Sequence, residues 1–525
     1  KYELKTDQNL VDGILVGMEK ETYQPAYFSP KPGYAEMDPN DYYDYLCVAC
    51  RRLVENHPEE IKRVQGAVVD CFRDSAVLLD KDRKVIRPMI LWLDSRMAKC
   101  EDPLPLFNRF AFKLVGMDYV IKMNRRRSVM NWIKENEPEN YQKCDKYVSV
   151  STFFIYRLTG ELKDTACSYT GHYPIDTKKG AWYKKPTKHF KGMVFSVKKS
   201  QLCDLVSPGG VLGQISEQAS RETGLPAGLK VFAGGSDKSC ETLGAGVVDT
   251  TMAAVSLGTA CSIETTTPHY TEPIRFLPGY ANVIPNSYNV DIQIYRGFWM
   301  VNWYLKEFGR EKIEDYFVET NPEAYNGRLK NIPVGSDGLI VQPFWGPLLD
   351  RPQVKGAMIG FSDYTTRDHV YRAIIEGIGY ELRYSLDGIR KQLKRRDHIR
   401  IIRISGGGAQ SDEICQIMAD IFNLPVSRVQ THETSSLGAA VAGFLAAGEF
   451  KDPDEAVKAM IHEEKMFNPN PENVKTYLDV SLKRFETVFP AAGSSNSAIE
   501  MTCEELERYS SNFSGWVDVC KPKEG

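Results

Sequence analysis

Residues 234–264, GGSDKSCETLGAGVVDTTMAAVSLGTACSIE, place two polar features between apolar runs. Asp237 follows a pair of glycines at the end of a strand-like run, so its carboxylate stands in a turn. Such a carboxylate suits a general base that must reach a hydroxyl group, or it caps the helix that follows. The residues alone support the two interpretations equally.

Gly258 and Thr259 form the second feature, a turn between two β-rich runs. The backbone N–H groups of such a turn, together with the threonine hydroxyl, can hold a phosphate oxygen. Turns of this composition are common between strands, so Gly258 and Thr259 alone are weak evidence for a phosphate site.

A stronger glycine turn lies in residues 399–422, IRIIRISGGGAQSDEICQIMADIF. A β-branched strand, the three glycines Gly406, Gly407 and Gly408, and a helix follow one another here. Glycines allow a ligand close to the backbone, and the N–H groups at the start of a helix attract anions. The spacing lacks the dinucleotide-binding fingerprint, and no GKS or GKT follows a glycine loop, which excludes a Walker-type site.

The amino-acid composition is typical of a folded globular protein. The chain has 525 residues, 42% hydrophobic and 26% charged, which is enough for two large domains or three smaller ones. Lys+Arg (66) nearly balance Asp+Glu (69), so a nucleic-acid partner is not expected. The absence of a long apolar run, and twelve cysteines without framework spacing, predict a cytoplasmic protein that does not enter the membrane.

Strand-like and helix-like segments are mixed along the chain, which predicts an α/β fold. A long amphipathic helix is expected over residues 371–393, YRAIIEGIGYELRYSLDGIRKQL. The new strand after residue 250 and the small, polar stretch PAAGSSNSA at 490–498 suggest boundaries. The predicted division is 1–250, 251–490 and a C-terminal appendage, 491–525.

Seven segments in order resemble the FGGY carbohydrate kinases, which include glycerol and xylulose kinases. The segments are PKPGYAEMDPNDYY (30–43), MILWLDSR (89–96), YRLTGE (156–161), GGSDKSCETLGAG (234–246), SLGTA (256–260), AIIEGIGYELR (373–383) and SGGGAQSDEICQIMADIFNLPV (405–426). The resemblance runs from about residue 30 to about residue 490. Within the family, GGSDKSCETLGAG and IYRGFWMVNW (294–303) look most like sugar-kinase subgroups that are poorly characterised.

The resemblance implies the fold and the reaction. It implies two ribonuclease H-like domains of the actin, Hsp70 and sugar kinase superfamily, with the active site in the cleft between them. The N-terminal domain is expected to bind a sugar or polyol and the C-terminal domain the nucleotide. ATP and Mg²⁺ are the implied cofactors, the reaction is phosphorylation of a hydroxyl group, and a homodimer is an expectation drawn from the relatives.

The resemblance also implies roles for individual residues. Asp237 aligns with the catalytic base. The nucleotide-binding residues are expected to be Gly258, Thr259, Gly406, Gly407, Gly408, Gln410 and Ser411. The substrate-binding residues are expected to be Arg73, Asp74, Trp92, Asp94, Arg96, Asp237, Lys238, Arg296 and Trp299. For Arg96 the alternative is a salt bridge to Asp94, and for Trp299 it is core packing.

One departure from the family concerns its N-terminal turn, D-x-G-T-x-S-x-K/R, which grips phosphate and Mg²⁺. The best register here is residues 3–10, ELKTDQNL, in which only Thr6 matches outright, Glu3 takes the place of the acidic residue and Lys5 replaces the glycine. Three explanations remain: another phosphate geometry, a chain shortened or altered at its N-terminus, or weakened catalysis. The alternative to a kinase is therefore a sugar- or nucleotide-binding protein with a regulatory role. An actin-like ATPase is disfavoured, because the segments around residues 73, 92 and 237 are typical of a sugar site.

Overall fold

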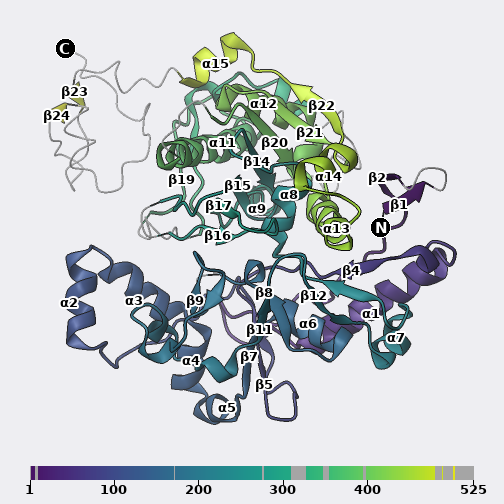
Figure 1. Cartoon of the computed structure of the whole chain (residues 1–525). Helices are drawn as coiled ribbons and strands as arrows, with labels where there is room; N and C mark the ends of the chain where they lie inside the picture. Colours follow the sequence, from purple (N-terminus) through teal and green to yellow (C-terminus); the bar gives the residue numbers. More distant parts are fainter. Residues whose placement is uncertain are drawn as a thin grey trace. The chain divides into compact units, whose positions relative to one another are not determined.

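Strands and helices alternate along the chain, as the α/β pattern predicts (Figure 1). The computed structural model describes residues 2–5, 10–170, 172–274, 277–308, 327–346, 354–393, 398–478, 487–488 and 501–502. The chain forms two units. Unit 1 is Lys1–Thr250, Thr265–Val290 and Glu433–His462, and unit 2 is Thr251–Glu264, Asp291–His432 and Glu463–Gly525. Neither unit is one continuous stretch, and the division falls inside strands β15 and β17.

The elements of unit 1 come mainly from the first 250 residues. They are β1 Tyr2–Lys5, β2 Leu10–Leu15, β3 Glu36–Met37, α1 Pro39–Asn56, β4 Gly66–Val68, β5 Ala76–Leu79, β6 Met89–Ile90, α2 Leu106–Leu114, α3 Asp118–Arg127, α4 Val129–Asn136, α5 Pro138–Lys143, β7 Lys146–Ser149, α6 Val150–Thr159, β8 Lys163–Thr165, β9 Ile175–Asp176, β10 Ala181–Trp182, β11 Asp204–Val206, β12 Val211–Gln214, α7 Glu217–Thr223, β13 Lys230–Phe232, α8 Asp237–Gly244, β16 Tyr280–Ala281, α13 Thr434–Ala447 and α14 Pro453–Met460.

The remaining described elements belong wholly or mainly to unit 2. They are β14 Met252–Leu257, β15 Cys261–Thr267, β17 Tyr288–Ile294, α9 Trp299–Phe308, β18 Ile340–Gln342, β19 Ala357–Ile359, α11 Arg367–Gln392, β20 Ile401–Ser405, α12 Asp412–Phe422, β21 Val426–Val429, β22 Glu463–Phe467, α15 Pro471–Leu478, β23 Thr487–Val488 and β24 Met501–Thr502. The long helix expected over 371–393 is confirmed as α11, and the strand–glycine–helix segment as β20 and α12.

A short parallel pairing organises the site region of unit 1. Strand β13 lies between β12, to which it is antiparallel, and β4, to which it is parallel. The register pairs Val68 with Phe232, so both strands end at the same edge of the sheet. Beyond the strands the two segments stay adjacent, because the backbone N–H of Asp237 donates to the carbonyl of Cys71 at 2.9 Å. Residues after β4 and after β13 are therefore neighbours.

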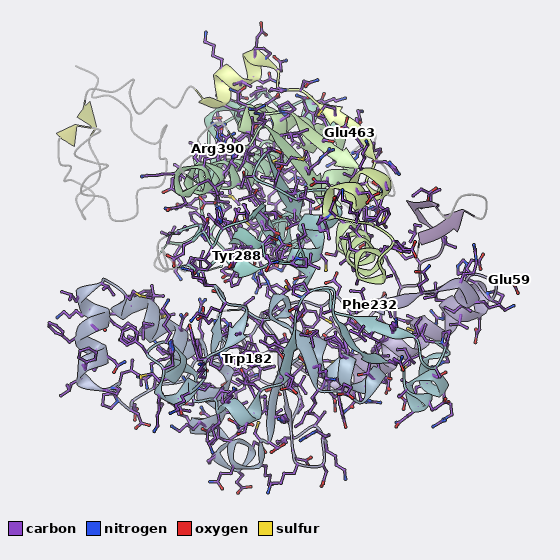
Figure 2. All side chains as sticks on the ribbon, viewed as in Figure 1. Glu59, Trp182, Phe232, Tyr288, Arg390 and Glu463 are labelled. Atoms are coloured by element: carbon purple, nitrogen blue, oxygen red, sulfur yellow. The ribbon has the colours of Figure 1, made fainter. Side chains whose placement is uncertain are left out.

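Apolar residues fill the interior of unit 1. The four residues of β5 are all buried, and β5 pairs with β6 and β7 in a second sheet of order β3-β6-β5-β7. Figure 2 draws the side chains, among them Trp182 and Phe232 of unit 1 and Arg390 and Glu463 of unit 2. Among the described residues, none of the helices combines the length and apolar character that a bilayer crossing requires.

In unit 2, two glycine turns follow neighbouring parallel strands. The seven-stranded sheet has the order β16-β17-β15-β14-β20-β21-β22, and β14 is parallel to β20 with Ser256 opposite Ser405. The Gly258–Thr259 step follows β14, and the three glycines follow β20. Because the carboxyl ends of parallel strands meet at one edge of a sheet, this register brings the two turns together.

The contact between α8 and α13 depends on glycine. A Cβ on Gly438 would lie 1.8 Å from the carbonyl oxygen of Cys240, and one on Gly244 would lie 1.8 Å from that of Thr434. The two helices therefore approach to backbone contact. The hydroxyl of Ser435 also donates to the carbonyl of Asp237 at 3.0 Å, which ties α13 to the first turn of α8.

Gly438→Ala should destabilise unit 1, because the added methyl group must push α13 away from α8. The expected cost is about 1–3 kcal/mol, measured as a lower midpoint of thermal or denaturant unfolding. Gly388→Ala is the matched control, since Gly388 lies inside α11 with nothing within 4 Å of its Cβ position. That control should be neutral or stabilising through helix propensity. Equal effects of both substitutions would contradict the close-contact account.

Candidate functional site

Asp237 is the first residue of α8, and Ser236 occupies the N-cap position before it. Asp237 is therefore not the N-cap residue of α8. Its Oδ1 accepts a hydrogen bond from the N–H of Lys238 at 2.8 Å. Burial raises the pKa of Asp237, while Lys238 and Arg73 oppose the rise. The result is a partly desolvated carboxylate with cations nearby, an environment that suits a proton acceptor.

Asp74 anchors the polar side chains on the β4 side of the site. Its backbone has φ 61°, a left-handed conformation that is uncommon for a residue with a Cβ. The hydroxyl of Thr170 donates to its Oδ1, and Nδ1 of His172 lies 3.3 Å from the same oxygen. Burial alone would raise the pKa of Asp74, but His172 and Thr170 bring it down to about 2. Burial lowers the pKa of His172, but the nearby Asp74 carboxylate outweighs this effect, so the pKa is raised overall.

Removing the Asp74 carboxylate should lower the pKa of His172. The folded state favours the charged imidazole, so the pair's stabilisation is complete below the ordinary histidine pKa and is lost as pH rises through the raised value. At the acid end, the depressed pKa of Asp74 keeps the pair until pH falls to about 2. Histidine ring-proton NMR titration of Asp74→Asn should show this drop, with His172→Gln identifying the resonance.

The control for that titration is His189, whose pKa is lowered by burial and owes nothing to Asp74. Its titration should be the same in both proteins. An unchanged His172 pKa in Asp74→Asn would mean that the 3.3 Å contact is not an ion pair in solution.

Arg73 and Trp92 lie beside this pair. The guanidinium of Arg73 lies over the ring of Tyr280, 5.2 Å from its centre, and lowers the pKa of Asp237. The backbone N–H of Trp92 donates to Ser75 Oγ at 3.0 Å, and 38% of this tryptophan is exposed. Unit 1 thus brings together Arg73, Asp74 and Asp237, and the partly exposed Trp92 is hydrogen-bonded to Ser75, the residue after Asp74.

Other predicted sugar ligands are already engaged within unit 1. Arg96 pairs with Asp94 at 2.7 Å and with Glu36 at 2.6 Å, and its guanidinium lies over the ring of Tyr34. The salt-bridge alternative for Arg96 is therefore what the structure contains. Lys238 similarly pairs with Glu241 at 2.7 Å.

In unit 2 the three glycines have different roles. A Cβ on Gly406, where φ is 84°, would lie 2.8 Å from the carbonyl carbon of Leu257, and one on Gly408 would lie 2.5 Å from the ring of Phe298. Both positions therefore require glycine for packing. Gly407 is exposed and has nothing within 4 Å of its Cβ position. It is the one of the three with open space in front of its backbone.

The remaining nucleotide candidates lie around these turns. The Gly258 carbonyl accepts from Phe298 N–H at 3.0 Å, and the Thr259 carbonyl accepts from Trp299 N–H at 3.3 Å. The hydroxyl of Ser411 caps α12 by accepting from Ile414 N–H at 3.3 Å.

Gln410 follows the glycines, and its carbonyl accepts from Arg428 at 3.3 Å. The guanidinium of Arg296 lies 5.0 Å from the ring centre of Trp299. Trp299 is only partly buried, and both residues belong to unit 2 rather than to the Asp237 group. Thr6 lies outside the described residues.

Three residues near the site escaped the sequence analysis. Thr170 and His172 meet Asp74 from almost a hundred residues away, a separation that leaves no local signal. Asp70 carried a signal, because it follows strand β4 and ligands of open α/β sheets bind beyond the carboxyl ends of the strands. Its Oδ1 is buried and has no hydrogen-bond partner among the residues that the structure describes.

Comparison with known proteins covers most of the chain. Residues 11–244 match the N-terminal domain, and residues 253–447 the C-terminal domain, of the FGGY family of carbohydrate kinases. The chain is 29% identical over 472 residues to "Uncharacterized sugar kinase YgcE" of Escherichia coli (strain K12), covering 89% of this chain and 87% of that protein. It is 28% identical over 477 residues to the xylulose kinase of Lactococcus lactis, covering 89% and 90%.

A solved structure gives the same fold. The gluconate kinase from Lactobacillus acidophilus superposes with a TM-score of 0.69 at 21% identity, over 86% of this chain and 88% of that one. This likeness concerns the fold, the two-domain arrangement that actin and Hsp70 share with sugar kinases.

Proposed function

Because the chain belongs to the FGGY family of carbohydrate kinases, we propose that it transfers the terminal phosphoryl group of ATP to a sugar or polyol hydroxyl with Asp237 as general base. The observation that supports this role is the environment of Asp237. Its carboxylate is partly desolvated, stands at the ends of two parallel strands, and has the Arg73 and Lys238 cations near it. A general base needs this combination of access and a raised pKa.

In the proposed reaction, Asp237 accepts the hydroxyl proton as the acceptor oxygen attacks the terminal phosphorus and ADP departs. Such transfers depend mainly on positioning and on stabilising charge at the phosphoryl oxygens. The N–H groups of the Gly258 and Gly407 turns, at one edge of the unit 2 sheet, are suited to hold the nucleotide. When bound, Mg²⁺ supplies positive charge that neutralises the phosphate oxygens.

The acceptor is proposed to bind to the Asp74 side of unit 1. Arg73 offers donors, the Asp74–His172 pair offers a polar contact of fixed orientation, and the exposed indole of Trp92 offers a face for the carbon skeleton. Relatives named xylulose kinase and gluconate kinase make xylulose and gluconate the first acceptors to test.

A second candidate is a protein that binds a sugar or nucleotide without efficient turnover. The register predicted for residues 3–10 is what motivates this candidate, because it places Lys5 where the family's turn has a glycine. Measurement of ADP release and of ligand-induced thermal stabilisation separates the two. Stabilisation without turnover would support this candidate.

Asp237→Asn should abolish most turnover without unfolding the protein. Loss of a general base costs about 10²–10⁴-fold in kcat, measured by coupled ADP release with a panel of acceptors. Because the carboxylate has a raised pKa in the folded state, ionising it near neutral pH opposes folding, so the asparagine variant should unfold at the same or a higher temperature. Asp204→Asn, at the exposed first position of strand β11, is the control and should leave turnover unchanged.

Gly407→Val should weaken nucleotide binding while leaving the fold intact. The side chain enters open space, so no packing cost is expected, but it occupies the approach to the turn. KM for ATP should rise by roughly tenfold or more, equivalent to about 1.4 kcal/mol of binding free energy. KM for the acceptor should not change. Gly388→Val serves as a control at another open glycine, and an unaltered ATP KM in Gly407→Val would remove this turn from the nucleotide site.

A further inference from the structure

Helix α2, Leu106–Leu114, carries the most exposed large apolar side chains that the structure describes. Leu106, Phe107, Phe110 and Leu114 are each at least 68% exposed, and we call these four side chains the α2 stripe. At about 3.6 residues per turn, they fall within about 100° of one another around the helix. Phe112, on the opposite side, is 1% exposed and belongs to the core of unit 1. The outward face of α2 is therefore apolar.

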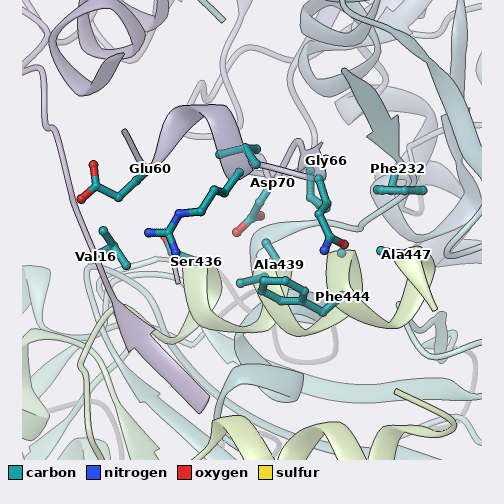
Figure 3. A pocket seen from close by; sticks show the side chains of 15 residues that line it. Val16, Glu60, Gly66, Asp70, Phe232, Ser436, Ala439, Phe444 and Ala447 are labelled. Atoms are coloured by element: carbon teal, nitrogen blue, oxygen red, sulfur yellow. The ribbon is translucent and has the colours of Figure 1, made fainter. Parts of the chain in front are cut away.

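An apolar stripe on a helix normally faces another part of the fold. Helix α13 follows that rule, because its Ala439 and Phe444 line a cavity of about 420 Å³ in unit 1, opposite the β4 segment (Figure 3). The α2 stripe lines no part of that cavity. Figure 1 shows α2 at the outer edge of unit 1, beside α3. A contiguous group of exposed apolar side chains marks an interaction site on a folded protein.

Positive charge surrounds the α2 stripe. Residues 106–127 contain six Lys or Arg residues and a single acidic residue, Asp118, although the whole chain has a net charge of -3. Arg109 and Lys113 are exposed, lie one turn apart on α2 and border the stripe, and Lys122 is exposed on α3. None of these three cations forms an ion pair with another residue that the structure describes. Their charge is therefore open to a partner.

This charge makes a second copy of the chain an unfavourable partner. Two copies related by a two-fold axis would bring the same surface together, so Arg109 and Lys113 of each copy would face those of the other. Like charges at such an interface are destabilising. An anionic surface, in contrast, compensates these cations while it covers the apolar side chains.

Membranes that contain anionic lipids offer both properties. Helices that lie in the interface of a bilayer carry Phe and Leu on one face and Lys or Arg on the other. Their cations attract anionic headgroups, and their apolar side chains are buried at the boundary between headgroups and acyl chains. A bilayer also needs no matching groove, which suits the convex face of a single helix.

We propose that α2 binds the surface of membranes that contain anionic lipids, with the α2 stripe facing the acyl chains and Arg109 and Lys113 facing the lipid phosphates. The helix has 9 residues. At about 1.5 Å per residue it is short, so the contact is small and reversible. No part of the chain needs to cross the bilayer, and the residues around Asp237 take no part. The inference therefore goes beyond the proposed function and does not depend on it.

The test is co-sedimentation of the full-length protein with lipid vesicles at low ionic strength. Vesicles of phosphatidylcholine and phosphatidylserine at about 3:1 should bind it about tenfold or more tightly than vesicles of phosphatidylcholine alone, because each Lys or Arg near an anionic surface adds to the attraction. Added salt should weaken that binding. Phe107→Ser combined with Phe110→Ser should weaken it by about tenfold or more. Arg109→Gln combined with Lys113→Gln should reduce the preference for phosphatidylserine.

Phe361→Ser combined with Tyr364→Ser is the matched control, since it removes two exposed aromatic side chains from unit 2 at the same spacing. It should leave vesicle binding unchanged. Exposed side chains contribute little to packing, so the variant without Phe107 and Phe110 should unfold at nearly the same temperature as the unaltered protein.

Leu106→Gln combined with Leu114→Gln removes the other half of the α2 stripe and serves as the test if the phenylalanine pair fails to fold. Absence of vesicle binding by the unaltered protein overturns the proposal, as does binding that both pairs of substitutions leave unchanged. Self-association that these substitutions abolish, without vesicle binding, would assign the stripe to a second copy. Stripe-dependent binding to polyglutamate, without vesicle binding, would assign it to an acidic protein. Either of these results also overturns the membrane proposal.

Discussion

The parallel pairing of β4 with β13 is the constraint on which the site in unit 1 depends. Only three residue pairs form this ladder, yet they align the ends of two segments that are about 160 residues apart in the chain. Asp70, Arg73 and Asp74 leave one strand, and Asp237 leaves the other. The hydrogen bond from Asp237 N–H to the Cys71 carbonyl extends the alignment past the strands. A shift of one residue in this register would separate the charges that set the pKa of Asp237.

The site has a consistent electrostatic character. Carboxylates at positions 70, 237 and 241 gather at one sheet edge, and Arg73 and Lys238 compensate them only in part. Burial of apolar side chains in unit 1, including all four residues of strand β5, stabilises the fold against this excess. Catalytic sites often hold several groups of the same charge, which oppose folding. Bound substrate and cation then neutralise that charge.

Sequence reasoning succeeded where the signal was local. The strand–glycine–helix order of residues 399–422 and the long helix α11 follow from periodicity and glycine placement alone. It could not assign a reason to each glycine, because Gly406 and Gly408 are required by Leu257 and Phe298, which are distant in the chain. It also left Arg96 undecided, since the partner Glu36 lies sixty residues earlier. The Asp74–His172 pair had no local pattern to reveal it.

The glycine-mediated contact of α8 with α13 has a consequence for biosynthesis. Leu243 of α8 shares a buried cluster with Val441, Ala456 and Met460, so unit 1 completes this cluster with residues made late in translation. At ordinary elongation rates, the interval between α8 and α13 leaving the ribosome is on the order of ten seconds. During that interval the apolar face of α8 lacks its partner helix. The nascent chain therefore exposes an apolar surface that chaperones can bind. Unit 1 cannot become compact until residues 433–462 have been synthesised.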